Sequence, residues 1–320
     1  MGSQNTQTAQ IINNFPRTYF RGIGQVMFQD NAWTGILFLC GIIWGAYASN
    51  TPLVAWGAVI GTLISTLTGY FLNLPDQKGA QGLWGFNGVL VGCAFPTFLG
   101  DTIWMWIALI LCSAMTTWVR TGMDLGLKKY NVSSLTFPFV FSTWLFLLAA
   151  RVLDGMAPVA MGNPEFDTES LSHLDMSFGN LVLYWLRGIS QIFLIDSWVT
   201  GIFFLVALAI SSWRAALWAA IASAISLFVA IVWHAPATDI AEGLYGFSAV
   251  LTGIALGATF CNFSWESTIW CILGIVATVF IQAGMNALVA PFGIPTLTGP
   301  FCVATWIFLL PQYKFFLPGK

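Results

Sequence analysis

The sequence repeats three short motifs in the same order and at nearly constant spacing. Each run of the first half returns in the second half with one change: RGIGQ at 21–25 as RGISQ at 187–191, GLWGF at 82–86 as GLYGF at 243–247, and LTFPF at 135–139 as LTGPF at 297–301. The offsets are 166, 161 and 162 residues, so a whole half of the chain is duplicated. A duplicated apolar chain is typical of transport proteins whose site lies where the two halves meet.

The composition places most of the chain in lipid. Of the 320 residues, 58% are hydrophobic and 8% are charged, whereas a soluble domain has about 25% charged residues. A chain with so little polar surface needs lipid as its solvent. The formal net charge of -2 argues against a basic nucleic-acid-binding face. The six cysteines lack metal-ligand spacing, so we expect buried thiols and neither a metal nor a cofactor.

Ten apolar runs are long enough to cross a bilayer, five in each half. They lie near 33–49, 53–73, 83–99, 102–120 and 135–151, and near 198–212, 214–233, 244–262, 266–286 and 299–316. Because five is odd, the second copy must enter the bilayer upside down relative to the first. The sequence therefore predicts an all-α polytopic membrane protein with ten spans, an inverted repeat and a central pore between its halves.

Each set of apolar runs follows a shorter segment, at 18–30 or 184–196, that contains the first motif. About a dozen residues are too few to span, so we expect one re-entrant half-helix per half. A helix that lies flat at the membrane interface is the alternative. The pairs Asp30-Asn31 and Asp196-Ser197 should then turn the chain and provide an N-cap oxygen for the next helix.

These segments divide the chain into four regions: a polar N-terminal tail (1–15), a first repeat half (16–152), an acidic linker (153–183) and a second repeat half (184–320). Of the eleven lysines and arginines, only Arg151 and Arg187 fall on the side of the membrane opposite the termini. The positive-inside rule therefore predicts cytoplasmic termini and an extracytoplasmic linker. The short loops favour a bacterial inner membrane.

No predicted helix centre carries a charge, which limits the transport mechanism. The acidic residues lie in connections or at the ends of spans, as do both histidines, His173 and His234. Ion-coupled pumps need ionisable groups inside the membrane, and a proton relay would need histidines there. We therefore expect passive conduction of a small uncharged solute.

Four repeated polar side chains lie at membrane depth: Gln25, Gln191, Thr136 and Thr298. An unpaired amide in hydrocarbon costs about 2–7 kcal/mol, so lining a path or bonding between helices must satisfy it. Each Thr-x-Pro-Phe run places a threonine hydroxyl at a helix N-cap and proline in the first turn. The chain before it enters the membrane unwound, which is tolerated only inside protein or along a polar path.

Apolar residues accompany the repeated polar ones. The set consists of Phe28, which follows Gln25 by one turn, and of two pairs that each share a helical face, Phe86 with Leu90 and Phe247 with Leu251. Opposed phenyl faces with oxygen acceptors along their edge admit a planar neutral molecule and reject a hydrated ion. Urea is flat, neutral and rich in N–H donors, so it fits this arrangement.

Taken together, these motifs resemble the urea transporter family over about residues 15–316. The Thr-x-Pro-Phe core is intact in both halves, although the first copy lacks the leading Leu-Pro of the signature. The resemblance implies a channel-like homotrimer with one pore per protomer. It also implies roles for particular residues: Gln25 with Phe28, and Gln191, would hold urea at the two mouths beside Phe86 and Phe247, while Thr136 and Thr298 would flank a middle constricted by Leu90, Leu251, Val26 and Ile192.

Three other classes of function fit the sequence less well. An ammonium channel needs paired pore histidines and a cation-binding mouth, and a membrane enzyme needs a cluster of His, Asp or Glu near one interface. A structural protein does not need duplicated polar residues at depth. The sequence predicts passive, channel-like diffusion of urea, with ammonia, ammonium or another small neutral amide as the alternative solute, by a protein that is not an enzyme.

Overall fold

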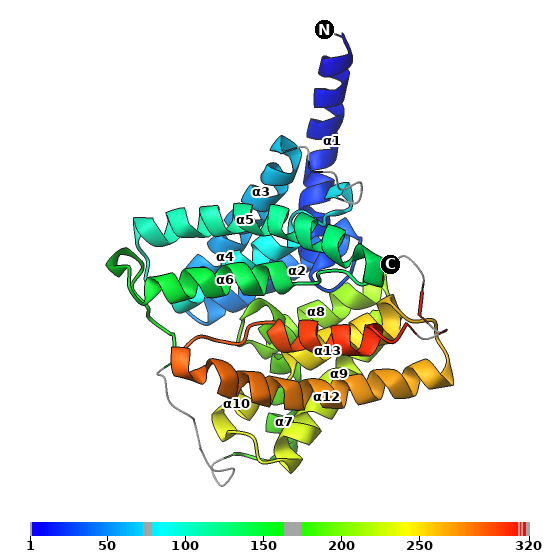
Figure 1. Ribbon diagram of the computed structural model, residues 1–320. Helices are drawn as coiled ribbons and strands as arrows, with labels where there is room; N and C mark the ends of the chain where they lie inside the picture. Colours follow the sequence, from blue (N-terminus) through cyan, green and yellow to red (C-terminus); the bar gives the residue numbers. More distant parts are fainter. Residues whose placement is uncertain are drawn as a thin grey trace.

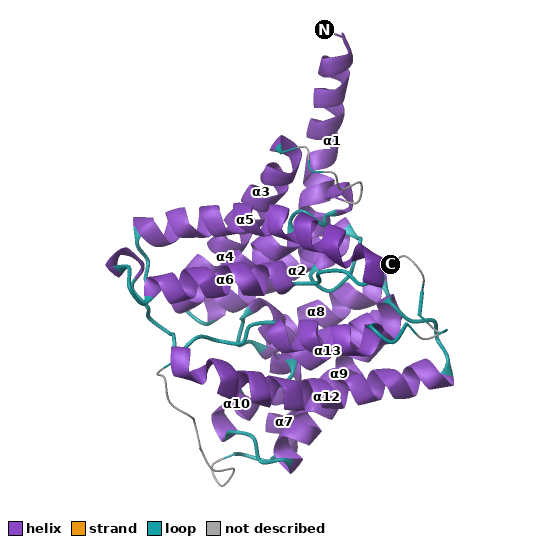
Figure 2. Ribbon diagram, in the orientation of Figure 1, coloured by secondary structure: helices purple, strands orange, loops and turns teal. Residues whose placement is uncertain are grey.

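The computed structural model describes residues 2–72, 74, 79–162, 174–312, 314, 316 and 317. Within these residues the regular secondary structure is helical, with isolated bridges but no strand (Figure 2). Much of the expected acidic linker, including His173, lies outside the described residues. The all-helical part of the prediction is confirmed.

Each of the ten predicted apolar segments contains a helix. The helices of the first half are α2 (Ala32–Ala48), α3 (Pro52–Phe71), α4 (Phe86–Phe98), α5 (Ile103–Leu127) and α6 (Phe137–Ala150). Those of the second half are α8 (Trp198–Ser211), α9 (Trp213–Val232), α11 (Phe247–Ile254), α12 (Trp265–Val289) and α13 (Gly299–Leu309), and α11 continues as the π-helical turn η6 (Ala255–Thr259). Figure 1 shows α2–α6 gathered in one part of the molecule and α8–α13 in the other.

The helices fall into two length classes. Among the described residues, α3, α5, α9 and α12 are long and apolar enough to cross a membrane, whereas the other apolar helices of the two halves have 17 residues or fewer. Helices α4, α6, α11 and α13 are short because each begins after a non-helical stretch. The chain is a polytopic membrane protein, and these short helices would reach across a bilayer only together with the unwound backbone before them.

The first repeated motif lies at the end of α1 (Gly2–Gln25) and of α7 (Phe178–Ser190), which continues as the turn η5 (Gln191–Phe193). The chain then bends by 72° between 178–193 and 198–211. Helix α1 already begins at Gly2, so the segment expected to be a polar tail is helical, and its N-terminal end projects away from the other helices (Figure 1).

The predicted N-caps after this motif are confirmed. The Asn31 side-chain oxygen accepts a hydrogen bond from the Trp33 backbone N–H at 2.9 Å at the start of α2. The Ser197 hydroxyl accepts one from the Thr200 backbone N–H at 3.3 Å at the start of α8. Each cap satisfies an N–H group that the helix leaves without a partner, which fixes where the helix after the motif begins.

Left-handed backbone conformations occur at equivalent positions of the two halves. The matched pairs are Phe28 (φ 62°) with Leu194 (57°), Gly82 (94°) with Gly243 (75°), Asn131 (54°) with Gly293 (59°), and Leu135 (54°) with Leu297 (52°). A leucine or phenylalanine in this region is strained and persists only where the surrounding structure holds it. The duplicated sequence therefore forms the same strained turns twice.

Helices α2 and α8 pack against each other across the two halves and exchange matched hydrogen bonds. The Thr34 hydroxyl donates to the Ala207 carbonyl at 3.0 Å, and the equivalent Thr200 hydroxyl donates to the Gly41 carbonyl at 2.8 Å. Thr34 and Thr200 occupy equivalent positions, and so do their acceptors, Gly41 and Ala207. Reciprocal contacts of this kind are the pattern that a two-fold relation between two copies produces.

Candidate functional site

The two repeated glutamines have matched hydrogen bonds. The Gln25 side-chain N–H donates to the Gln81 carbonyl at 2.9 Å, and the Gln191 side-chain N–H donates to the Glu242 carbonyl at 3.1 Å. Both acceptor carbonyls directly precede the second repeated motif. Because the amide nitrogen is engaged with protein, the side-chain oxygen is the group that can accept a hydrogen bond from a solute.

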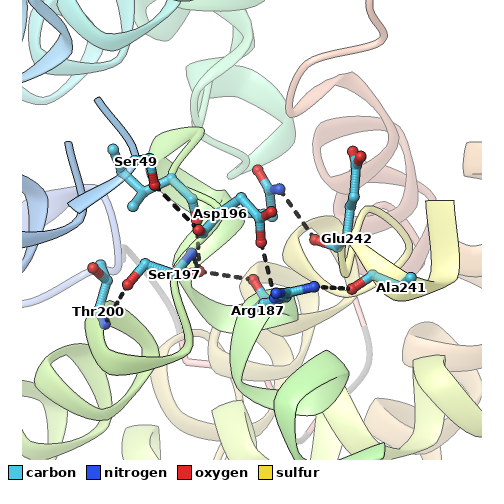
Figure 3. A network of polar contacts seen from close by, with 10 residues as sticks. Ser49, Arg187, Asp196, Ser197, Thr200, Ala241 and Glu242 are labelled. Carbon is cyan, nitrogen blue, oxygen red and sulfur yellow. Dashed lines mark hydrogen bonds and ion pairs between the residues drawn. The ribbon is translucent and has the colours of Figure 1, made fainter. Parts of the chain in front are cut away.

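An arginine and an aspartate bracket each glutamine. Arg21 Nε lies 3.0 Å from Asp30 Oδ1, and Arg187 Nε lies 3.0 Å from Asp196 Oδ1 (Figure 3). Arg187 Nη1 also donates to the Ala241 carbonyl at 2.9 Å, which ties the first motif of the second half to the second one (Figure 3). These ion pairs hold both ends of the segment that carries the glutamine.

Glu242 lies beside this network in the connection before α11. Burial and the nearby Asp196 carboxylate raise the pKa of Glu242, and the Arg187 guanidinium acts in the opposite direction. The Glu242 carbonyl accepts the hydrogen bond from Gln191, so its backbone supports the glutamine whatever the charge of its side chain. This hydrogen bond to the Gln191 amide therefore does not involve the Glu242 carboxyl group.

The two repeated threonines contact each other directly. Thr136 Oγ1 and Thr298 Oγ1 are 2.6 Å apart and buried, and Thr136 Oγ1 also lies 3.3 Å from Cys302 Sγ. Both threonines occupy the N-cap positions of α6 and α13, as predicted, with proline in the first turn. The prediction that their hydroxyls cap these helices is wrong, because neither makes a side-chain cap hydrogen bond. The hydroxyls bond across the two halves instead.

The unwound backbone before these helices is held by tryptophans from the opposite half. Trp144 Nε1 donates to the Pro295 carbonyl at 2.8 Å, and the equivalent Trp306 Nε1 donates to the Ser133 carbonyl at 2.9 Å. The indole N–H thus satisfies a carbonyl that no helix satisfies. These two reciprocal hydrogen bonds hold the unwound backbone before Thr136 and Thr298 in position.

Most of the predicted apolar residues are buried. The six that were expected to line the mouths and the constriction are all buried: Val26, Ile192, Phe86, Phe247, Leu90 and Leu251. The Phe28 ring is partly exposed and lies edge-on to Phe260 and Phe301, with centroid distances of 5.4 and 6.0 Å. The first-half ring is therefore seated on aromatic rings of the second half.

A cavity of about 570 Å³ is lined mostly by residues of the second half, together with Phe98 and Phe139 of the first half, and reaches Thr298. Of the predicted site residues, Gln191, Ile192, Phe247 and Thr298 line it. Thr136 adjoins it through its contact with Thr298. The remaining predicted residues lie outside its lining: Gln25, Val26, Phe28, Phe86, Leu90 and Leu251. The cavity thus reaches both Gln191 and Thr298, and Gln25 is not among its lining residues.

Sequence reasoning missed five polar residues of this cavity: Asp239, Tyr245, Gln282, Asn286 and Thr296. Gln282 and Asn286 lie on α12, one turn apart and therefore on the same face. Their signal was present, since they are two amides at i, i+4 spacing near the end of the apolar run 266–286.

Known proteins are similar in sequence to this chain over most of its length. The family model for the urea transporter matches residues 17–313. Urea transporter 1 of Ovis aries is 31% identical over 298 residues, which cover 92% of this chain and 76% of the sheep protein. Urea transporter 1 of Rattus norvegicus is 31% identical over 303 residues, which cover 94% of this chain and 78% of the rat protein. The chain therefore belongs to the urea transporter family, whose members are transport proteins and not enzymes.

Proposed function

We propose that this protein conducts urea passively across a membrane through a narrow slot between its two halves. The observation that carries the proposal is the contact between Thr136 and Thr298, which are equivalent residues of the two copies. Two equivalent residues can touch only at the axis that relates their copies. The threonine pair would therefore mark the middle of the passage.

The reciprocal hydrogen bonds support an inverted repeat. The α2–α8 pair and the two tryptophan bonds both relate the halves by exchange of equivalent partners. With five helices per half, an inverted repeat of ten spans about an axis in the membrane plane would account for this exchange. The excess of lysine and arginine on the side of the termini would make that side cytoplasmic. Gln191 would then face the extracytoplasmic side, which is the periplasm if the membrane is a bacterial inner membrane.

The groups along the slot suit a solute that donates several hydrogen bonds. The oxygens of Gln25 and Gln191 would accept N–H groups at the two mouths, and the threonine hydroxyls would accept them in the middle. To pass, urea must replace the 2.6 Å hydroxyl–hydroxyl bond with its own bonds to Thr136 and Thr298. Because one hydrogen bond is exchanged for others, the solute can lose its water without a large penalty.

The buried apolar residues near these oxygens would select against ions. Leu90, Leu251, Val26 and Ile192 are buried and offer no dipoles that could replace the hydration shell of an ion. Phe86 and Phe247 are buried beside them and would restrict the solute to a planar shape. A neutral planar amide pays less to enter such a slot than ammonium does, because it carries no charge to desolvate.

Nothing in the described spans offers a site for a coupling ion at their centres. The charged residues of the described helices α2–α6, α8, α9 and α11–α13 are Arg214 and Glu266, in the first turns of α9 and α12, and Arg120 and Asp124, in the C-terminal part of α5. Arg120 and Asp124 also form an ion pair at 2.9 Å and so neutralise each other. This distribution supports a passive mechanism, because a coupled transporter needs an ionisable group that binds and releases the driving ion.

Lipid and further copies of the chain would cover the outer surface. Large apolar side chains on the described helices are exposed, among them Trp44, Trp56 and Trp118. Such a surface is stable only against lipid or another protomer. Together with membership of the family, it supports a homotrimer in which each protomer has its own passage.

Stopped-flow light scattering on proteoliposomes tests the proposal. Under an inward urea gradient, vesicles that contain the protein should re-swell faster than protein-free vesicles of the same lipid. Acetamide and ammonia gradients, applied to the same vesicles, distinguish urea from the alternative solutes. Urea rates equal to those of protein-free vesicles would exclude the proposed function, and faster ammonia than urea flux would favour the alternative.

A further inference from the structure

The second half contains one extra residue in the helix that follows the second motif. The offset between equivalent residues is 161 at the second motif and 162 at the third. In α4 the Thr97 hydroxyl donates to the Cys93 carbonyl at 2.8 Å, four residues back; the equivalent Thr259 hydroxyl donates to the Ile254 carbonyl at 3.2 Å, five residues back. The π-helical turn η6 occupies this stretch, and a π turn spans one residue more than an α turn. The extra residue therefore lies in η6.

Two side chains of α9 support this π turn. Arg214 Nη2 donates to the Gly257 carbonyl at 3.2 Å. A Cβ atom at Gly257 would lie 2.4 Å from ring atoms of Trp218, so the indole packs where only glycine leaves room. The first half has Leu53 and Gly57 at the positions of Arg214 and Trp218. The second half therefore accommodates its extra residue with a hydrogen bond and an indole ring that the first half lacks.

The π turn ends at Phe260, the equivalent of Phe98. The Phe260 backbone N–H donates to the Ala255 carbonyl at 2.8 Å. The Phe260 ring is 7% exposed and lies edge-on to Phe28, with ring centroids 5.4 Å apart and planes at 83°. Phe98, by contrast, is partly exposed and lines the cavity. The two equivalent phenylalanines thus have different surroundings, and only Phe260 is packed against Phe28.

The backbone of Phe260 is also bound by the C-terminal segment, by which we mean residues 316 and 317. The Leu317 backbone N–H donates to the Phe260 carbonyl at 2.8 Å, and an antiparallel bridge joins the adjacent residues. The first half has a matching hydrogen bond, from the Val159 N–H to the Phe98 carbonyl at 2.9 Å. In each half, the chain after the last helix therefore fixes the backbone of this phenylalanine.

Phe28 is a residue whose orientation depends on its neighbours. Its backbone is left-handed, with φ 62°, and a phenylalanine keeps this conformation only where the surrounding structure holds it. An edge-on contact between two rings restrains their relative orientation as well as their distance. At the equivalent turn of the second half, Leu194 has no ring to orient, and α4 is α-helical up to Phe98.

We propose that Phe260 is a positioning residue for Phe28 at the Gln25 mouth. The π turn and the C-terminal segment fix Phe260, and the Phe260 ring fixes the orientation in which Phe28 meets the solute. This inference rests on the proposed function, which gives Phe28 its contact with the solute. The packing of Phe28 against Phe260 can nevertheless be measured without any transport.

Fluorine NMR on the full-length protein in detergent tests the positioning directly. Para-fluorophenylalanine replaces Phe28, and its resonance is compared in Leu317→Pro and Leu317→Ala. Proline removes the N–H that binds the Phe260 carbonyl and alters neither ring, whereas alanine keeps this N–H. We expect a shifted or a second resonance in the proline variant and the wild-type resonance in the alanine variant. A wild-type resonance in the proline variant, or equal shifts in both variants, would overturn the proposal.

A double-mutant cycle tests the consequence for transport. Phe260→Leu should lower the urea-to-thiourea flux ratio by about twofold, the low end for one aromatic pair, and should have no further effect when Phe28→Leu is already present. Phe280→Leu is the matched control, because it loses an edge-on contact with Trp233 on exposed surface and should keep the wild-type ratio. An unchanged ratio in Phe260→Leu, or equal reductions with and without Phe28→Leu, would refute the positioning role. Absence of wild-type urea flux would refute the proposed function alone, because the fluorine resonance reports on Phe28 without flux.

Discussion

In the first half, Arg120 and Asp124 of α5 form an ion pair, whereas Gln282 and Asn286 occupy the equivalent positions of α12. Arg120 and Gln282 nevertheless donate to the same backbone carbonyl of the second motif, that of its leucine. The two halves thus keep the contact that fixes the backbone and differ in the charge beside it. Backbone contacts define the shared architecture, and the remaining side-chain chemistry is free to differ.

A similar difference occurs closer to the threonine pair. The Asn87 side-chain oxygen accepts a hydrogen bond from the Phe139 backbone N–H at 3.2 Å, in the first turn of α6. The equivalent residue of the second half is Ser248, whose shorter, buried hydroxyl has no partner among the described residues. The two halves therefore differ in side-chain length and in hydrogen bonding at this pair of equivalent positions.

The largest effect is expected where the halves are most alike. Thr136→Val and Thr298→Val should each reduce urea flux by about 10- to 100-fold, because the solute meets a methyl group where it needs an acceptor. Both variants should be affected equally, since the two hydroxyls lie at one point of contact. Stopped-flow rates per reconstituted protein measure this. Thr143→Val is a matched control, because it changes a buried threonine of α6 outside the cavity lining.

Unequal urea flux of the two threonine variants would contradict the equivalence of the two halves at the threonine pair. If Thr136→Val abolished flux and Thr298→Val had no effect, the middle would not be shared by the two halves. Flux like that of the wild type in both variants would remove the threonines from the passage.

The next largest effect is expected on the free energy of unfolding, which should respond differently to substitutions at equivalent positions of the two halves. Arg120→Ala leaves the Asp124 carboxylate without its ion-pair partner and should destabilise the protein by about 3 kcal/mol. Gln282→Ala removes one neutral hydrogen bond and should cost about 1 kcal/mol. Thermal unfolding in detergent, followed by tryptophan fluorescence, compares them. Similar shifts of the melting temperature would show that the charge at these positions has little structural weight.

Much of this arrangement could be predicted from the sequence because it follows from periodicity and local chemistry. The repeated motifs predicted that Thr136 and Thr298 occupy equivalent positions, and Asn31 and Ser197 predicted the helix starts that the structure has. The helix N-cap position of Thr136 was also predicted, but its hydroxyl partner was not. That partner, Thr298, lies 162 residues away, and local sequence patterns carry no information on such distant contacts.

The cavity illustrates the same limit. Gln282 and Asn286 stand near the end of an apolar run, where an amide is as compatible with helix contacts as with a solute site. Only the position of α12 relative to Gln191 and Thr298 brings them into one cavity. Sequence analysis also placed Gln25 and Gln191 in equivalent roles, and the structure gives them matched hydrogen bonds, although only Gln191 lines the cavity.

A smaller effect is expected from exchanging the residues at the left-handed turns. Phe28→Leu gives the first half the residue that Leu194 provides in the second, in a backbone conformation that leucine already adopts there. The variant loses the edge-on contacts with Phe260 and Phe301, so discrimination between urea and the larger thiourea should fall by about threefold, the value of one aromatic pair. Flux ratios for the two solutes measure it, and Leu194→Phe is the reciprocal variant. An unchanged ratio in both would mean that the turns are structural only.

The smallest effect is expected from a pH gradient, because both ends of the proposed passage carry the same titratable pair. Arg21 with Asp30 and Arg187 with Asp196 have the same 3.0 Å separation, and no carboxyl, amine or imidazole contacts the described threonine pair. Urea equilibration should therefore reach the same end point with an acidic interior, an acidic exterior or no gradient, as measured with radiolabelled urea in proteoliposomes. Accumulation above the external concentration under one orientation of the gradient would require a proton site in one half alone, and Glu242, whose pKa burial raises, would be the first residue to replace by glutamine.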